Sequence, residues 1–179
     1  VTDASAHPEG WSVAVKDHLS AIRKTLTCKV LVNAAGPWVS QLDGKIAGSE
    51  KAHPLRLVKG SHLVLPKLSA QNKAFLLQHE DGRVVFVIPY LDDYSLVGTT
   101  EEEYTGDLDA PQISESEVSY LLKIVNHYFK VNVSDEQIVG AFSGIRPLIE
   151  NEGEQASRVS RDYRLQLNRL PAPMLSVYG

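Results

Sequence analysis

Cysteine is almost absent from this chain of 179 residues, in which Cys28 is the single example. One cysteine excludes an internal disulfide and a cysteine-rich metal cluster. Cysteine is among the most often buried residue types, so Cys28 is expected to be a small buried strand residue. The scarcity of cysteine also favours a reducing, cytoplasmic compartment.

Long apolar runs are absent as well. The longest, Lys29–Ala35 and Val84–Pro89, are strand-sized, whereas a membrane-spanning helix needs about 20 apolar residues. No charged start followed by an apolar core indicates a secretory signal peptide. The basic residues are scattered and the net charge is −4, which argues against a nucleic-acid surface. With 43% hydrophobic and 22% charged residues, the composition is typical of a soluble globular protein.

The motifs of several enzyme classes are missing too. The sequence contains no GxGxxG, Walker loop, HExxH or GxSxG, so no complete dinucleotide, nucleotide, zinc-protease or serine-hydrolase signature is present. No metal site is predicted, because metal-ligand spacing is not seen among the histidines, which are His7, His18, His53, His62, His79 and His127.

What the chain does contain is a succession of strand-like segments. Alternating or continuous apolar residues predict strands at 11–15, 21–27, 29–35, 55–66, 74–78, 83–89, 94–99, 137–143, 158–167 and 174–178. Turn residues at 81–82 and 92–93 predict an antiparallel meander. We expect a linker at 44–53 and an acidic loop at 149–155. Gly144 and Pro147 are expected to stop the strand 137–143 and turn the chain.

One clear helix begins at Ser114. Glu117 follows three residues later, and this pair predicts a capping box at the helix N-terminus. Val118, Leu121 and Val125 then recur on one face, so the helix is expected to cover a sheet. A shorter helix is expected after residue 36, since proline suits a first helical turn.

Two segments in the first half of the chain have unusual residue patterns. In Val32–Trp38, small residues at a strand end allow a ligand to approach the backbone, although tight strand–helix packing is the more ordinary explanation for this segment alone. In Lys59–His62, alternation places Gly60 and His62 on one face, and Gly60 removes bulk beside the histidine. A histidine has a suitable intrinsic pKa to accept a hydroxyl proton, or it is a satisfied structural residue.

Two further segments contain arginines. Arg146 lies in SGIRP, where a glycine and a proline restrict the backbone. A guanidinium held in this way is suited to gripping oxyanions. Arg161 lies in SRDY and could bind a phosphate or carboxylate. Each arginine is also compatible with an ordinary surface role, as a solvated turn residue or as half of a charge pair with Asp162.

Taken together, the order and spacing of these segments resemble the FAD-dependent glycerol-3-phosphate dehydrogenases, within the amino-acid-oxidase-like flavoproteins. The matching stretches are VNAAGPWV, HPLRLVKGSHLVLP, DGRVVFVIPYLDDYSLVGTTEEEYTGD, ESEVSYLL, SGIRPL and SRDY. None is decisive alone, but the series in this order is highly specific.

The resemblance implies an α+β fold. A mixed or antiparallel sheet covered by helices would form a substrate-capping domain at 52–150. Residues 1–48 would contribute a β-meander and a strand of an FAD-binding domain, and 151–179 would return toward that domain. The chain is therefore expected to be an internal piece of a longer enzyme, since it lacks an initial methionine and the family's N-terminal βαβ unit.

The resemblance also implies residue roles. His62 matches the family position near the reacting hydroxyl, where it would act as base or proton partner. Arg146 matches an arginine near the oxygen-bearing carbons of the substrate, and Arg161 one that grips phosphate. Ala34, Ala35 and Gly36 match a strand end that lies against FAD.

The implied reaction is the oxidation of sn-glycerol 3-phosphate to dihydroxyacetone phosphate, with electrons passing through FAD to quinone. A cytoplasmic enzyme in peripheral contact with the inner membrane face is expected. The isolated piece is expected to be inactive and to bind FAD weakly. A glycerol-3-phosphate oxidase, another amino-acid-oxidase-like flavoenzyme and a non-catalytic binding module remain alternatives.

Overall fold

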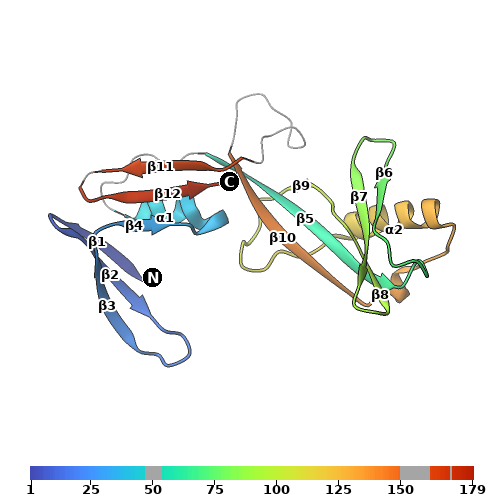
Figure 1. Cartoon of the computed structure of the whole chain (residues 1–179), viewed down its shortest axis with the longest axis horizontal. Coiled ribbons are helices and arrows are strands. Elements are labelled where there is room, and N and C mark those ends of the chain that lie inside the picture. Colours follow the sequence, from blue (N-terminus) through green and yellow to red (C-terminus); the bar gives the residue numbers. More distant parts are fainter. Residues whose placement is uncertain (47–53, 150–161, 170) are drawn as a thin grey trace. The chain divides into compact units, whose positions relative to one another are not determined.

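The computed structural model describes residues 1–46, 54–149, 162–169 and 171–179. The chain divides into two compact units, whose elements are labelled in Figure 1. The first unit contains Val1–Arg56 and Pro147–Gly179, and the second contains Leu57–Arg146. Each unit therefore has its own sheet structure, and the first is assembled from both ends of the chain.

The first unit contains two small sheets. Strands β1 (Asp3–His7), β2 (Gly10–Lys16) and β3 (Arg23–Cys28) pair antiparallel in that order. The second sheet has the order β11-β12-β4, in which β12 (Met174–Tyr178) pairs antiparallel with β11 (Arg164–Asn168) and parallel with β4 (Leu31–Asn33). A 3-10 turn, η1 (Gly36–Trp38), and helix α1 (Val39–Lys45) follow β4.

The core of the first unit joins segments from both ends of the chain. Its buried members are Trp11, Val13, Ile46, Ala172 and Met174. The Trp11 indole N–H donates a hydrogen bond of 2.7 Å to the carbonyl of Pro173, so the largest core side chain is also satisfied as a donor. Cys28 lies half-buried at the end of β3 and packs against this cluster.

The second unit is a six-stranded sheet with one long helix. Its order is β10-β5-β8-β7-β6, with β9 also paired to β5. The bounds are β5 (Leu55–Pro66), β6 (Phe75–Gln78), β7 (Val84–Tyr90), β8 (Tyr94–Gly98), β9 (Glu102–Glu103) and β10 (Gly140–Ile149). A 3-10 turn, η2 (Asp135–Gln137), precedes β10. The pairs β6·β7, β7·β8 and β8·β5 are antiparallel, which confirms the predicted meander.

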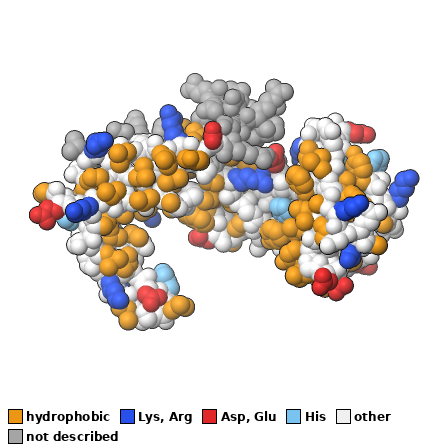
Figure 2. All heavy atoms as spheres, viewed as in Figure 1, with side chains coloured by type: hydrophobic (Ala, Val, Ile, Leu, Met, Phe, Trp, Pro, Cys, Tyr) orange, Lys and Arg blue, Asp and Glu red, His pale blue; other side chains and the backbone are white. Residues whose placement is uncertain are grey.

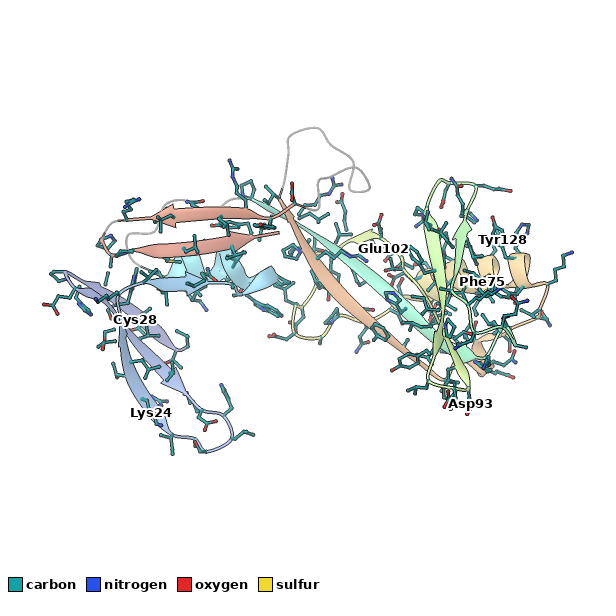
Figure 3. All side chains as sticks on the ribbon, viewed as in Figure 1. Lys24, Cys28, Phe75, Asp93, Glu102 and Tyr128 are labelled. Atoms are coloured by element: carbon teal, nitrogen blue, oxygen red, sulfur yellow. The ribbon has the colours of Figure 1, made fainter. Side chains whose placement is uncertain are left out.

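Helix α2 (Glu115–Phe129) covers one face of this sheet. Its buried apolar residues meet the inward residues of β5, β7 and β8, namely Leu63, Leu65, Val85, Val87 and Val97. Phe75 of β6, labelled in Figure 3, packs edge-on against Phe129 at the helix end. On the face of the sheet opposite to α2, the side chains of Leu76, Phe86 and Ile88 are exposed. Figure 2 shows hydrophobic side chains gathered over β6 and β7.

The helix start and the α+β class agree with the sequence predictions. Ser114 is the N-cap of α2, and its hydroxyl and the Glu117 carboxylate form the predicted capping box. The fold consists mostly of antiparallel and mixed strands with two α-helices among the described residues. No helix in that part of the chain is long and apolar enough to cross a membrane.

Two strand predictions are wrong in extent. The run 29–35 forms only the three-residue strand β4, and Val32 is 55% exposed, because β4 is an end strand that pairs only with β12 in the described sheet. The strand expected to stop at Gly144 and turn at Pro147 instead continues to Ile149. β10 lies at the edge of its sheet, where a proline without an N–H is tolerated.

Strand β1 was not predicted, because its sequence DASAH has few apolar residues. The expected acidic loop at 149–155 and residues 158–161 of the predicted strand 158–167 lie outside the described residues, apart from Ile149 at the end of β10. The expected linker at 44–53 overlaps α1 at its start, and its residues 47–53 are also outside.

Candidate functional site

His62 lies on the β5 face opposite to helix α2. Leu63 and Leu65 point into the helix-covered core, so strand alternation places His62 on the other side. Gly98 of β8 is its direct cross-strand partner. A Cβ atom at position 98 would lie 2.2 Å from the imidazole Cδ2, so the ring rests directly over a residue that has no side chain.

The imidazole is also stacked on an aromatic ring. The rings of His62 and Phe142 of β10 are 5.0 Å apart between centroids and inclined by 10°. The His62 Nδ1 atom is buried without a hydrogen-bond partner among the described residues. Burial, and then the positive charge of Arg146, lower the pKa of His62 below its ordinary value of 6.5. The ring is therefore neutral near pH 7 and has a nitrogen able to accept a proton.

Arg146 lies on the same sheet face, near the end of β10. Its Nη2 donates to Thr99 Oγ1 at 3.3 Å, and its Nη1 is 3.7 Å from a Glu101 carboxylate oxygen. Nη1 is buried and has no hydrogen-bond partner in the described part of the chain. A fixed guanidinium with a donor to spare is suited to binding an oxygen of a ligand.

Two glycines, Gly60 and Gly98, lie against Arg146 and His62, but not in the arrangement that the sequence predicted. The expectation that Gly60 makes room for His62 is wrong, because a Cβ there would meet Thr99 Oγ1 at 2.6 Å and Arg146 Nη2 at 2.9 Å. Gly60 therefore leaves room for the Arg146 side chain, and Gly98 leaves room for the His62 ring. Sequence alternation identified the shared face, but cross-strand register decided which glycine lies under which side chain.

The helix side of β5 contains a charged cluster that sequence reasoning missed. Lys59 Nζ lies 2.9 Å from Glu117 Oε2 and 3.5 Å from Glu102, which is labelled beside β5 in Figure 3. Ser61 donates to Glu117 at 2.8 Å, and Thr100 donates to it at 2.6 Å. Glu117 is only 2% exposed. The signal available in the sequence was a capping-box glutamate on the apolar side of its helix.

Burial disfavours the ionised form of Glu117, but hydrogen bonds from Thr100, the Ser114 backbone and Lys59 more than offset it and lower the pKa of this carboxyl. Burial likewise disfavours the charged form of Lys59. The contacts with Glu117 and Glu102 outweigh that effect and raise the pKa of Lys59. Both groups therefore stay charged across the neutral range, so the cluster is an ion pair that joins the helix to the sheet.

Ala34, Ala35 and Gly36 belong to the first unit, at the end of β4. Ala34 is exposed, whereas Ala35 and Gly36 are half-buried. Gly36 has a φ of +55°, and a Cβ there would meet nothing within 4 Å. A strand end with bare backbone and no bulky side chain fits the close approach of a flat ring system.

This strand end is held by a buried polar network that was also missed. The Asn33 amide donates to Asp43 Oδ1 at 2.7 Å and to the Val39 carbonyl at 2.9 Å. Asp43 also accepts hydrogen bonds from Ser176 and Tyr178 of β12. All four polar side chains in this network are at most 2% exposed, so β4, α1 and β12 are joined without an unsatisfied carboxylate. Arg161 lies outside the described residues.

Comparison with known proteins identifies the family. The profile of the DAO family, FAD dependent oxidoreductase, matches residues 1–166. The chain belongs to this family. Its members depend on FAD, and the bare strand end at Ala34–Gly36 is sterically compatible with such a cofactor.

Three similar proteins narrow the relationship within the DAO family. The chain is 42% identical to the aerobic glycerol-3-phosphate dehydrogenase of Escherichia coli over 94% of its own length and 34% of that protein. It is 37% identical to the D-erythritol 1-phosphate dehydrogenase of Brucella abortus over 100% of its length and 36% of that protein. The structure of the Bacillus halodurans glycerol-3-phosphate dehydrogenase, complexed with FAD, matches with a TM-score of 0.81 and 27% identity.

That structural match covers 98% of this chain and 33% of the Bacillus protein. The chain thus spans about a third of the length of the relatives it matches. These findings bear out the resemblance to FAD-dependent glycerol-3-phosphate dehydrogenases read from the sequence.

Proposed function

We propose that this chain provides the substrate-binding sheet and part of the cofactor-binding region of an FAD-dependent sn-glycerol 3-phosphate dehydrogenase. The observation that carries the proposal is the placement of His62 and Arg146 on one sheet face, each with a buried nitrogen that lacks a hydrogen-bond partner among the described residues. An alcohol substrate offers a hydroxyl for one of these nitrogens and a further oxygen for the other.

His62 serves in this proposal as the acceptor of the hydroxyl proton. Its lowered pKa keeps it neutral at the pH of catalysis, and its stacking on Phe142 orients the ring. Removal of the proton from the substrate hydroxyl favours the loss of hydride from the same carbon. When bound, FAD supplies the acceptor for that hydride.

Arg146 serves to hold an oxygen close to the reacting carbon. Its contacts with Thr99 and Glu101 restrain the guanidinium. Nη1, which is 3.7 Å from the Glu101 carboxylate, makes no hydrogen bond to the described residues and is the donor left for the ligand. Because the Arg146 charge also lowers the pKa of His62, the same side chain would bind substrate and favour the neutral form of its neighbour. Arg161 is proposed as the phosphate ligand on the sequence resemblance alone.

The cofactor region is proposed at Ala34, Ala35 and Gly36, where small residues leave the backbone accessible. The Asn33–Asp43 hydrogen bond would hold this strand end in place. Quinone as the electron acceptor, a cytoplasmic location and a peripheral membrane contact are parts of the same proposal, supported by similarity to aerobic glycerol-3-phosphate dehydrogenases.

A second candidate substrate is D-erythritol 1-phosphate. The Brucella relative named for that substrate aligns over the whole chain. It is also a polyol phosphate, so it requires the same acceptor for a hydroxyl proton and the same donor to a neighbouring oxygen. The two candidates differ in the length of the carbon chain.

The deciding experiment follows anaerobic bleaching of the flavin in the complete flavoprotein that contains this chain. Wild type is expected to bleach with sn-glycerol 3-phosphate, while Arg146→Met should need at least about tenfold more substrate, since a hydrogen bond to a charged group is lost. Lys67→Met is the matched control, because Lys67 lies five residues along the chain from His62, beyond the end of β5, and its ammonium bonds to the Asp92 carbonyl.

If both variants need equally more substrate for bleaching than wild type does, the assignment of Arg146 to substrate binding is wrong. If wild type is bleached by D-erythritol 1-phosphate but not by sn-glycerol 3-phosphate, D-erythritol 1-phosphate is the substrate and the proposed residue roles stand. No bleaching with either compound would overturn the proposed reaction.

A further inference from the structure

A β-bulge lies directly beside the candidate site. His62 pairs with Gly98, and three residues earlier Lys59 pairs with Glu102. Between these pairs β5 has two residues, Gly60 and Ser61, whereas the opposing segment has three, residues 99–101. One extra residue on one strand is a bulge, and bulges redirect side chains next to functional sites.

The bulged segment supplies both described partners of the Arg146 guanidinium. Thr99 Oγ1 accepts from Nη2 at 3.3 Å, and the Glu101 carboxylate lies 3.7 Å from Nη1. Thr99 also donates from Oγ1 to the Thr100 carbonyl at 3.0 Å, which orients the hydroxyl lone pairs. The position of the guanidinium therefore depends on the shape of this three-residue segment.

Thr100, the middle residue of the bulge, faces the opposite side of the sheet. It is 1% exposed. Its hydroxyl oxygen accepts from the Ser61 backbone N–H at 2.9 Å and donates to Glu117 Oε1 at 2.6 Å. The Thr100 backbone N–H donates to the Ser61 carbonyl at 3.3 Å. A side chain thus replaces a sheet hydrogen bond that the extra residue interrupts.

Both carboxylate oxygens of Glu117 are held by hydrogen bonds or an ion pair. Oε1 accepts from Ser61 and Thr100. Oε2 accepts from the Ser114 backbone N–H at 2.7 Å and contacts Lys59 Nζ at 2.9 Å. The first turn of α2 therefore provides a rigid point of attachment for the bulge.

We propose that Thr100, bound to Glu117 of α2, is a positioning residue that sets the guanidinium of Arg146 in its substrate-binding orientation by holding the bulge 99–101. The proposal rests on the proposed function of Arg146. It assigns a role in substrate affinity to residues that lie on the helix side of the sheet and do not touch substrate.

The test uses the complete flavoprotein and two readouts. One is the steady-state KM and kcat for sn-glycerol 3-phosphate, and the other is the Kd for the product dihydroxyacetone phosphate, from the change it causes in the flavin absorbance spectrum. Thr100→Val, which keeps the shape but removes the hydroxyl, is expected to raise KM and Kd about fivefold, as for the loss of one or two hydrogen bonds. Thr100→Ser is expected to restore values near wild type.

Two further variants separate positioning from general destabilisation. Asn126→Leu removes a half-buried amide that bonds to the Val133 backbone elsewhere in the same unit. It should lower the Tm and leave KM unchanged. Thr99→Val cuts the contact to Arg146 and leaves Thr100 bonded to Glu117. It should raise KM as Thr100→Val does, and it provides the test if Thr100→Val fails to fold.

Unchanged KM and Kd in Thr100→Val, or in Thr99→Val where Thr100→Val does not fold, would overturn the proposal. An equal rise in KM in Asn126→Leu would do the same. If Arg146→Met leaves the Kd for dihydroxyacetone phosphate unaltered, the proposed function of Arg146 is wrong. A large effect of Arg146→Met with no effect of either threonine variant refutes the positioning role alone.

Discussion

At the scale of single residues, the proton affinity of His62 links the geometry of the site to its chemistry. The ring is partly buried, rests over Gly98 and lies within the field of Arg146. Both burial and the neighbouring charge disfavour the imidazolium, so both lower the pKa. A base of this kind loses its function only when the pH falls below its lowered pKa, and the acid limb of the activity profile should therefore lie below pH 6.5.

The effects of burial and of the Arg146 charge on the pKa of His62 can be separated by substitution. Arg146→Met removes the charge and leaves the ring buried, so the pKa of His62 is expected to rise toward 6.5 without exceeding it. NMR titration of the Cε1 proton would measure the change, and a His62→Gln variant would identify the signal. Lys67→Met serves as the control, since it removes an equal charge five residues along the chain from the ring, beyond the end of β5. A pKa of His62 that stays constant or falls in Arg146→Met would contradict this account.

At the scale of elements, α2 and β5 are joined by more than apolar contact. Glu117 is buried at the helix start and pairs with Lys59 of the strand. The pKa of Glu117 is lowered in the folded chain, so the unfolded chain binds its proton more readily as the pH falls. The stabilisation is therefore fully present above about pH 4.5, the ordinary pKa of a glutamate, and is lost as the pH drops through the lower folded value.

Glu117→Gln is expected to test this connection. The substitution removes the negative charge and leaves Lys59 buried beside Glu102 alone, so unfolding of the second unit at pH 7 should require about 3 kcal/mol less free energy. The difference from wild type should shrink as the pH falls below 4.5, because wild-type Glu117 also becomes neutral. Chemical denaturation monitored at several pH values would measure it. A difference that is independent of pH would show that the charge of Glu117 does not contribute.

At the scale of the whole chain, the two units have separate hydrophobic cores. The cluster around Leu121 and Val97 belongs to the second unit, and the cluster around Trp11 and Met174 belongs to the first. Both tryptophans, Trp11 and Trp38, lie in the first unit. Most of the described helix lies in α2 of the second unit. Tryptophan fluorescence and helical circular dichroism therefore report on different units.

Leu121→Ala should destabilise the second unit by about 2–5 kcal/mol, as expected for a cavity in a packed core. The circular dichroism transition is expected to move to lower denaturant while the tryptophan transition stays in place. Met174→Ala should do the opposite. If both signals shift together in either variant, the chain unfolds as a single cooperative unit and the separation of the cores has no energetic consequence.

The local pattern of the sequence was sufficient where a short-range rule applies. Leu55–Pro66 is a strand because its side chains alternate, and α2 begins after Ser114 because a serine and a glutamate three residues later satisfy the helix N-terminus. The same alternation placed His62 on the face opposite to Lys59 and Ser61. The VNAAGPWV and SGIRPL segments identified Arg146 and the strand end at Ala34–Gly36 through resemblance, and their roles stay predictions.

What only the tertiary structure decided depends on residues far apart in the chain. The pairing of His62 with Gly98, the contact between Arg146 and Thr99, and the burial of Glu117 against Lys59 each join positions 36 to 58 residues apart. Asp43 meets Ser176 across 133 residues. The extent of β10 through Pro147 likewise follows from its place at a sheet edge. The periodicity of the sequence predicts which face of a sheet a side chain occupies. Strand register and bulges determine which residues it contacts there, and both are set by the packing of strands that are distant in the chain.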